Sequence, residues 1–485
     1  MRENRPMKFS HILTRKISFA VKPFSCDASR RFSAVNHQQS LHSINGIKMN
    51  NLNNLHNDIG IDPLAKPRAR NAARMAEISR PHFNAAYEKG LMGVSCRVGD
   101  YRRIEIATTG QQVVDYTRCG YLNLDSHPRV LAAARAAADE IKSVHFSVAR
   151  TRLSAEPLAR LESTLSNLFQ VNGVVVFPTV AAANMGALPL LAAGLFTGGV
   201  KPLIVFDRFA HVTLQYHIPV LREETDVVVI EHNDLEHLER LCQSHPLVAY
   251  VGDGAYSMGG AAPVRELRSL QDKYGLFVYL DDAHGISVVG KRGEGFVRSQ
   301  LSGLDHRTVV AASLGKGYGA AGGMLMLGSH DIENAVRRYA PTYGFSCAPS
   351  MASVGAALAS AEIHMSEELG MLQRSLQQNL ALFDHVIPTE TIGSQLPIRI
   401  YRIGNEERAI ATGEYLLERG HYVSVVFFPT VPRGEAALRM AVTAAHDPDD
   451  IRELSALLRA REGEEAVETN GVAVVGSDEA APALV

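Results

Sequence analysis

Short apolar runs separate longer segments in which apolar positions recur at helical spacing. Runs typical of strands occupy residues 174–177, 277–280, 397–403 and 422–426, and residues 101–114 alternate as a hairpin does. Helices are predicted over residues 71–89, 126–141, 263–273 and 407–419, with an alanine-rich helical region from 352 to 383. This mixture of strands and helices predicts an α/β fold.

The apolar run at 277–280 ends abruptly in two acids and a histidine, Asp281, Asp282 and His284. Buried charges need partners, and ligands of open α/β sheets bind at the carboxyl ends of the strands. Successive side chains of a strand point to opposite faces, so Asp281 and Asp282 cannot face the same ligand. The pattern therefore predicts one acid aimed into a binding site at this edge.

Lys316 follows His284 by 32 residues and is the only charged residue between Arg307 and His330. A lone lysine among glycines and apolar residues tends to have a lowered pKa, which suits Schiff-base chemistry. The strand-end acids and the lysine among glycines together predict a site for pyridoxal 5'-phosphate. Lys316 would bind its aldehyde, and a strand-end carboxylate would contact its pyridinium nitrogen. A surface lysine and a helix-capping aspartate pair are the alternatives. A dinucleotide loop is disfavoured because the strand, GxGxxG and helix unit with a downstream acid is absent.

The motifs DDAHG, SLGKGYGAAGG and AYSMGGAAPV resemble those of the α-oxoamine synthases, class II relatives of the fold-type I pyridoxal phosphate aminotransferases. The resemblance covers about residues 116–458. It implies a large domain with a mostly parallel sheet of the seven-stranded type between helices, and a smaller α+β carboxyl-terminal domain. It also implies a reaction that joins an amino acid to the thioester of an acyl-CoA or an acyl carrier protein. Carbon dioxide is usually lost, and the product is an α-amino ketone.

The resemblance assigns roles to individual residues. Lys316 holds the cofactor, Asp281 faces the ring nitrogen, His284 hydrogen-bonds to the ring phenolate and His211 stacks on the ring. The remaining implied positions are Ser257 near the ring hydroxyl, Thr179, Val180 and Ser313 at the phosphate, Ser346 at the phosphate of a neighbouring subunit, and Arg439 and Cys119 at the amino-acid substrate.

Three departures from the family pattern lie near the substrate and the phosphate. Cys119 stands where the family has an asparagine, and HFSVARTRLS lacks the usual Gly-Ser-Arg. Thr179, Val180 and Ala181 replace a Ser-Gly-aromatic sequence at a predicted strand-to-helix turn, although a helix amino terminus can still bind phosphate. With these departures, the sequence does not identify the amino-acid substrate or the acyl chain.

Composition and charge limit the kinds of molecule that the protein is expected to bind. The net charge is −2 and the isoelectric point is about 6.8, so neither nucleic acid nor an anionic membrane is indicated. Five scattered cysteines without a CxxC pair predict reduced thiols, no disulfide framework and no metal site. Residues 163–200 carry no charge, but prolines and amides interrupt them, so a membrane span is not predicted.

The organisation along the chain is expected to be an amino-terminal extension (1–70), a leading segment (71–125), a large cofactor-binding domain (126–355), a small domain (356–463) and a tail (464–485). Residues 1–50 hold nine Lys or Arg against two acids, as organellar presequences do. A disordered basic arm, or a true start at Met49, explains them equally well. We expect a cytoplasmic protein, with an organellar location as the alternative.

Three other functions remain open from the sequence. They are another fold-type I enzyme such as an aminotransferase, a lyase that cleaves 2-amino-3-ketoacids, and a non-catalytic subunit of a heterodimeric synthase. Such subunits typically lack the lysine, so Lys316 disfavours the last. The resemblance at residues 341–350 also implies a homodimer with shared active sites.

Overall fold

The structure is a computed structural model that describes the backbone of residues 72–100 and 102–475, and side chains as far as Glu464. The predicted amino-terminal extension and its targeting alternative lie outside the described residues. The described residues belong to one compact unit. Its three sheets have seven, four and three strands.

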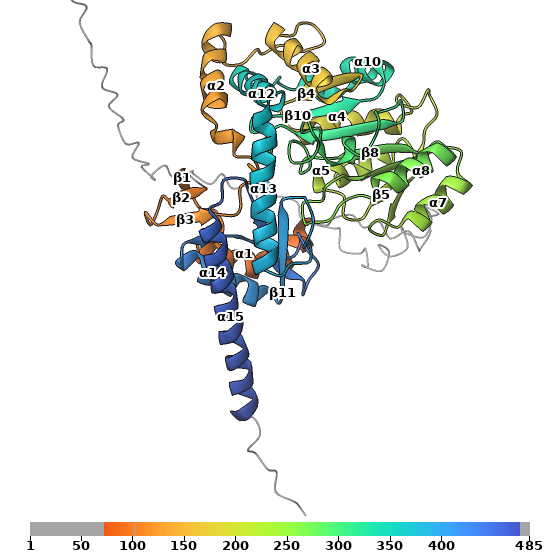
Figure 1. The fold of residues 1–485 in the computed structure, drawn as a ribbon. Helices are drawn as coiled ribbons and strands as arrows, with labels where there is room; N and C mark the ends of the chain where they lie inside the picture. Colours follow the sequence, from red (N-terminus) through yellow and green to blue (C-terminus); the bar gives the residue numbers. More distant parts are fainter. Residues whose placement is uncertain (1–71, 101, 476–485) are drawn as a thin grey trace, which may run out of the picture. The chain divides into compact units, whose positions relative to one another are not determined.

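The seven-stranded sheet is the large predicted one (Figure 1). Its strands lie in the order β4, β10, β9, β8, β7, β5, β6, and β10 alone runs antiparallel to its neighbours. Their bounds are β4 Gly173–Phe177, β5 Leu203–Asp207, β6 Val227–Ile230, β7 Val248–Asp253, β8 Phe277–Asp281, β9 Thr308–Ser313 and β10 Gly323–Leu327. This mostly parallel sheet confirms the predicted fold class.

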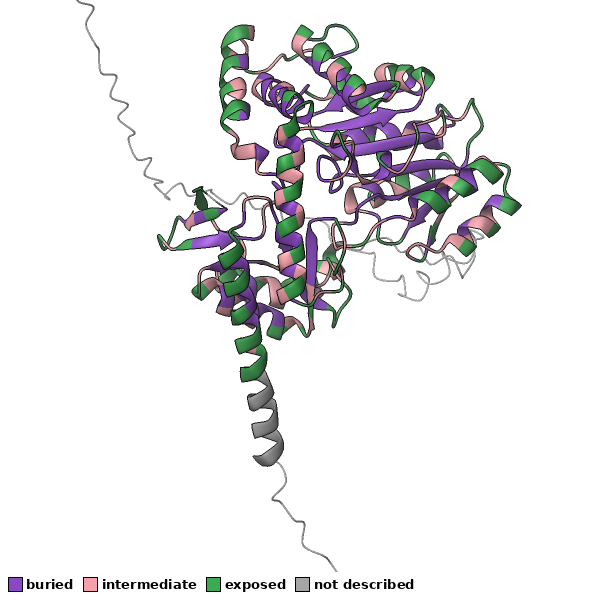
Figure 2. Cartoon of the chain, viewed as in Figure 1, coloured by how far each residue is buried: buried purple, intermediate pink, exposed green. Residues whose placement is uncertain are grey.

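Helices cover both faces of this sheet, and its strands are almost entirely buried (Figure 2). Val278 and Leu280 of β8 pack into one core with α3, α7, α8 and α12, whereas Phe277 and Tyr279 pack into another with α4, α5, α6 and α10. The bounds are α3 Glu156–Phe169, α7 Leu235–Ser244, α8 Val264–Tyr274, α12 Met351–His364, α4 Val180–Ala192, α5 Val212–Gln215, α6 Ile218–Leu221 and α10 His330–Tyr339. The continuous apolar character of the strands follows from burial on both faces.

The leading segment and the small domain, which the sequence suggested as separate units, share a sheet and a core. Strand β12 (His421–Tyr422) pairs with β3 (Gln112–Asp115), which continues into β2 (Arg103–Ile106) and β1 (Cys96–Val98). A third core cluster joins apolar side chains of both segments. Pairing between short strands some 300 residues apart leaves no local signal in the sequence, so only the folded chain shows it.

The small domain also holds an antiparallel sheet ordered β11, β14, β13, with bounds Ile398–Gly404, Ala436–Ala441 and Ser424–Val426. The strand predicted at 422–426 is thus divided between two sheets. The other elements of this end of the fold are α1 Ala72–Glu88, η1 Leu124–Ser126, α2 Pro128–Ile141, α13 Glu367–Val386, α14 Glu406–Glu418 and α15 Pro448–Val475. Two short helices complete the large domain, α9 Gly295–Arg298 and α11 Pro341–Phe345.

The structure divides one predicted helical region into two helices and corrects the start of the expected tail. The region predicted at 352–383 is two helices, because Ser366 caps α13 by accepting a hydrogen bond from Glu368 N at 3.3 Å. The tail expected from residue 464 begins inside α15, whose far half extends away from the other helices in Figure 1. Residues 460–468 are rich in Ala and Glu, and extending an existing helix adds one hydrogen bond for each residue fixed.

No helix within the described residues is long and apolar enough to cross a membrane. Cys96, Cys119, Cys242 and Cys347 are free thiols. Across the described parts of the chain, no group of three or more His, Cys, Asp or Glu side chains is arranged to hold a metal ion.

Leu325 should be a sensitive probe of the large sheet. It lies at the centre of β10, is fully buried, and pairs with Val175 and Ala311 on its two sides. We expect Leu325→Ala to lower the free energy of unfolding by about 2–5 kcal/mol in urea titrations, through lost burial and the cavity it leaves. Leu131→Ala, at a partly exposed position of α2, should cost well under half as much. Equal losses for the two variants would contradict this placement of β10.

Candidate active site

Asp281 ends β8 at the carboxyl edge of the large sheet, on the face covered by α4. Its Oδ2 accepts a hydrogen bond from Asn184 Nδ2 at 3.0 Å, and its Oδ1 accepts one from Ala283 N at 3.1 Å. Asn184 is oriented in turn by Tyr279, whose hydroxyl donates to its Oδ1 at 2.8 Å. The Asp281 carboxylate is therefore buried, and these hydrogen bonds fix its orientation.

Asp282 points to the opposite face, as strand alternation predicts. Its Oδ2 accepts a hydrogen bond from Val297 N at 3.0 Å, at the start of α9, and its Oδ1 has no partner among the described residues. A Cβ on Gly285 or Gly295 would come within 2.4 Å of this carboxyl, so the loop can close around Asp282 only with glycine at both positions. Asp282 anchors the loop that follows the site and does not face it.

Lys316 lies beside His284. The Nζ of Lys316 is 2.7 Å from His284 Nε2, and His284 Nδ1 is 2.6 Å from the hydroxyl of Tyr121. Tyr121 is fully buried and His284 is only 5% exposed. Residues from three distant parts of the chain thus form one hydrogen-bonded row at the edge of the sheet.

Burial sets the charges along this row. It lowers the pKa of Lys316, although Cys119 and Asp281 act in the opposite direction. Burial, followed by the neighbouring charges of Lys316, Arg439 and His211, holds the pKa of His284 well below its ordinary value, so its imidazole is neutral. A neutral imidazole next to a lysine with a lowered pKa is an arrangement suited to holding and moving a proton.

A second carboxylate, Asp253, was missed by the sequence reasoning. It ends β7 directly beside Asp281 in the parallel register and accepts a hydrogen bond on Oδ1 from His211 N at 2.9 Å. Burial, and then the charge of Asp281, raise the pKa of Asp253 well above its ordinary value. Asp253 therefore holds the backbone of His211 next to Asp281. Its one signal in the sequence was its place at the end of an apolar run.

The turn that presents His211 is braced from the neighbouring strand end. Asp207 accepts hydrogen bonds from His232 Nδ1 at 3.1 Å and from Asn233 N at 2.8 Å. The side chain of Asn233 also donates to Ala261 O at 3.2 Å, in the turn that contains Ser257. The sequence suggested only a helix start here. Asp234 does cap α7 by accepting a hydrogen bond from His237 N at 2.9 Å. The two residues before it, His232 and Asn233, instead join two turns of the site.

Arg439 reaches the site from β14 of the small domain. Its Nε donates to Ser257 O at 2.7 Å, and its Nη2 lies 3.8 Å from Cys119 Sγ. Burial by itself would raise the pKa of the Cys119 thiol, but Arg439 and Tyr121 bring it below its ordinary value. The structure thus brings together Arg439, Cys119 and Ser257, the last through its carbonyl oxygen.

The predicted phosphate site lies where α4 begins. The Thr179 side chain caps this helix by accepting from Ala182 N at 3.0 Å, and the N–H groups of Val180 and Ala181 have no hydrogen-bond partner within the described chain. Ser313 lies opposite Gly323 in the sheet, and a Cβ on Gly323 would come 2.2 Å from Val180 N. The open N–H groups, the hydroxyl of Ser313 and the glycine make a cradle that fits a phosphate group.

The Ser346 side chain forms its hydrogen bonds within its own segment. Its hydroxyl donates to Thr342 O at 2.7 Å, and Thr342 in turn donates to Ala182 O of α4 at 2.6 Å. Within the described chain, no hydrogen bond joins Ser346 to Lys316, Asp281 or His284. The next residue back, Phe345, is 93% exposed.

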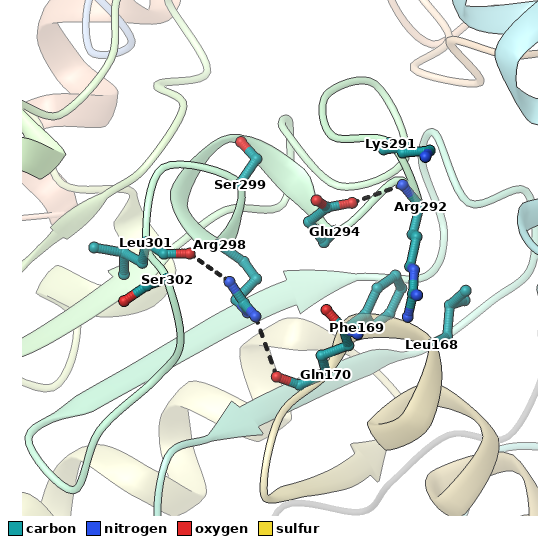
Figure 3. A pocket seen from close by; sticks show the side chains of 10 residues that line it. All are labelled: Leu168, Phe169, Gln170, Lys291, Arg292, Glu294, Arg298, Ser299, Leu301 and Ser302. Carbon is teal, nitrogen blue, oxygen red and sulfur yellow. Dashed lines mark hydrogen bonds between the residues drawn. The ribbon is translucent and has the colours of Figure 1, made fainter.

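Figure 3 shows a cavity of about 350 Å³ elsewhere in the large domain. It is lined by residues 168–170 and by residues between 291 and 302, and Arg298 spans it by donating to Leu301 O at 2.6 Å and Gln170 O at 3.2 Å. None of the predicted site residues lines this cavity. It is separate from the cluster around Lys316.

Residues 120–458 match the model of the aminotransferase class I and II family. The chain belongs to this family. Among its relatives are the 8-amino-7-oxononanoate synthase of Geobacter sulfurreducens, 30% identical over 77% of this chain and 95% of the relative, and a putative 8-amino-7-oxononanoate synthase of Acidiphilium cryptum, 32% identical over 73% and 89%. These similarities confirm the predicted α-oxoamine synthase resemblance within the aminotransferase class I and II family.

Solved structures confirm the fold. The serine palmitoyltransferase of Sphingomonas wittichii superimposes with a TM-score of 0.70 at 22% identity, over 81% of this chain and 99% of that one. The 8-amino-7-oxononanoate synthase of Francisella tularensis gives 0.61 at 20% identity, over 74% and 99%. Similar serine palmitoyltransferase structures contain pyridoxal phosphate, and together with the aminotransferase family they confirm the predicted cofactor and the prediction of an enzyme.

The residues present fit that cofactor. Lys316 offers an amine, the phosphate cradle lies at the start of α4, and Asp281 is a buried carboxylate at the neighbouring strand end. The individual assignments of His211, Ser257, Ser313, Thr179 and Val180 remain predictions, now with positions in the fold.

Asp282 predicts how stability depends on pH. Burial raises the pKa of its carboxyl to about 8. The folded chain therefore keeps a proton that the unfolded chain releases above about pH 4, so this group makes the free energy of unfolding fall as the pH rises from about 4 to about 8. Asp282→Asn should make that fall less steep, by up to about 1.4 kcal/mol per pH unit, in urea titrations of the cofactor-free protein. An unchanged slope would contradict a protonated Asp282.

Proposed function

We propose that the protein joins an amino acid to an acyl thioester, with loss of the amino-acid carboxylate as carbon dioxide, and releases an α-amino ketone. The observation that carries the proposal is the row in which Lys316 Nζ lies 2.7 Å from the neutral His284, at the strand end that also presents Asp281. The names of the 28–32% identical relatives support the same reaction class.

In this proposal the bound cofactor supplies an electron sink for negative charge at the substrate Cα. Lys316 holds the cofactor, then takes and returns protons at the substrate Cα, a task for which its lowered pKa suits it. Asp281, fixed by Asn184, keeps a proton on the ring nitrogen. His284 hydrogen-bonds to the ring phenolate and assists Lys316.

Substrate recognition is proposed for Arg439 and Cys119. Because Nε of Arg439 is bound to Ser257 O, the guanidinium is fixed by the large domain while its terminal nitrogens stay near Cys119. A guanidinium held in this way suits a carboxylate, which it can bind through two parallel hydrogen bonds. Cys119 is smaller than the asparagine of the family pattern, so the room available to the amino-acid side chain differs at this point.

The decisive experiment follows absorbance of the purified holoenzyme, first with a panel of amino acids and then with acyl-CoA and acyl carrier protein thioesters. We expect one amino acid to change the cofactor spectrum, and thiol release and carbon dioxide to appear only when a thioester is added. Lys316→Ala should reduce turnover by at least about 1,000-fold because covalent attachment and the base are lost together. Lys291→Ala, at an exposed lysine beside the cavity of Figure 3, should keep full turnover.

The same assay, extended with keto acids and with 2-amino-3-ketoacids plus free CoA, separates the alternatives. An aminotransferase would convert the cofactor to its amine form and need a keto-acid acceptor, and a lyase would cleave 2-amino-3-ketoacids in the presence of free CoA. Either result without condensation would overturn the proposal, as would a protein that takes up no cofactor. A non-catalytic subunit would bind substrates without turnover until a partner chain is added.

We propose a homodimer in which Ser346 approaches the neighbouring subunit's cofactor phosphate. The exposed Phe345 beside it supports a protein–protein contact there. Phe345→Asp should convert the dimer to a monomer in analytical ultracentrifugation and lower turnover at least about tenfold, since a charge in an apolar contact is costly. Ile392→Asp, at another exposed apolar position, should leave both unchanged. A Phe345 variant that stays dimeric and active would remove this segment from the interface.

A further inference from the structure

Tyr121 is a buried residue of the active-site row to which the sequence assigned no role. It follows Cys119 by two positions in a loop that precedes η1, and its hydroxyl lies 2.6 Å from His284 Nδ1. His284 Nε2 on the other side of the ring faces Lys316 Nζ at 2.7 Å. Each imidazole nitrogen therefore has one partner, and the two partners differ in what they can do.

The hydrogen bonds of this row are limited by which atoms can donate and which can accept. A lysine ammonium only donates, whereas a tyrosine hydroxyl both donates and accepts. A neutral imidazole carries one N–H and one bare nitrogen. When Lys316 carries its proton, Nε2 must be bare to accept it, so Nδ1 must carry the imidazole proton and donate to the Tyr121 oxygen. The Tyr121 proton then turns away from His284 toward Cys119, two residues earlier in the same loop, and the Tyr121 hydroxyl helps to lower the pKa of that thiol.

We propose that Tyr121 is a positioning residue that holds His284 in the tautomer protonated at Nδ1, and so sets the pH at which Lys316 gives up its proton and can capture the cofactor aldehyde. The inference deepens the proposed function by naming the group that tunes its lysine. Other charged or titratable groups that act on the row are Arg439 and Cys119 at its Tyr121 end, and Asp281, Asp253 and His211 at its Lys316 end.

Removing the Tyr121 hydroxyl leaves a buried N–H of His284 without an acceptor whenever Lys316 is charged. A lost hydrogen bond of this kind costs about 0.5–1.5 kcal/mol, which corresponds to about a 2- to 12-fold change in an equilibrium. The equilibrium between the protonated and neutral forms of Lys316 shifts toward the neutral form by that factor. In the tautomer with Nε2 protonated, the bare Nδ1 could use the hydroxyl only if the Tyr121 proton turned back from Cys119, so the loss weakens this tautomer less and it gains population.

The test uses Tyr121→Phe, which removes one oxygen atom, with Tyr116→Phe as its matched control. Tyr116 is equally buried and stacks on His446 at 4.3 Å between ring centroids, but its hydroxyl has no partner within the described chain. The first readout is the ¹⁵N chemical shifts of His284 in the cofactor-free protein, identified by comparison with His284→Asn. The second is the rate of capture of added pyridoxal 5'-phosphate against pH, followed by absorbance.

We expect wild type and Tyr116→Phe to show His284 protonated at Nδ1, with the same midpoint in the capture profile. Tyr121→Phe should shift the tautomer equilibrium about fivefold toward Nε2 and move the midpoint to lower pH by about half a unit to one unit. Identical tautomers and midpoints in the two tyrosine variants would overturn the proposal.

A wild-type ring protonated at Nε2 would overturn it without any variant, even if Tyr121→Phe failed to fold. Neither readout involves a thioester or product formation. Failure of the condensation reaction is therefore distinguishable from failure of this inference.

Discussion

The site depends on keeping one ammonium group inside the protein next to neutral and anionic partners. A buried lysine without partners would pay a large desolvation cost, and its charge would be lost. Here Lys316 has His284 at 2.7 Å, while Asp281, Asp253 and Cys119 raise its pKa against the effect of burial. The balance, to which Arg439 adds a further lowering of the pKa, leaves an amine that gives up its proton more easily than an exposed lysine does.

The large sheet supplies this environment through its register. Strands β7 and β8 end side by side, so Asp253 and Asp281 arrive as neighbours, and alternation along β8 turns Asp282 away to the other face. Antiparallel β10 enters the same edge and puts Gly323 against the start of α4. A carboxylate, a lysine and a phosphate cradle therefore meet because strand ends meet, although they are far apart along the chain.

Hydrogen bonds between turns then hold the site residues in place. Asp207 and Asn233 tie the turn of His211 to the turn of Ser257, and the carbonyl of Ser257 holds Arg439 from the small domain. The two domains are thus joined through Arg439, the side chain proposed to bind the substrate carboxylate. A substrate carboxylate that bound Arg439 would act on the same turn that contacts the cofactor site.

The sequence by itself determined the class of fold, the family and the cofactor, and it singled out the central residues. An apolar run ending in acids, and a lone lysine among glycines, have few physical explanations, and both are local patterns. Only the tertiary structure decided the partners: Asp253 beside Asp281, Tyr121 behind His284, Asn233 between two turns, and β12 paired with β3. These contacts join residues from about 30 to more than 300 positions apart. No short stretch of sequence records them, because they exist only when the strands are in register and the sheets are closed.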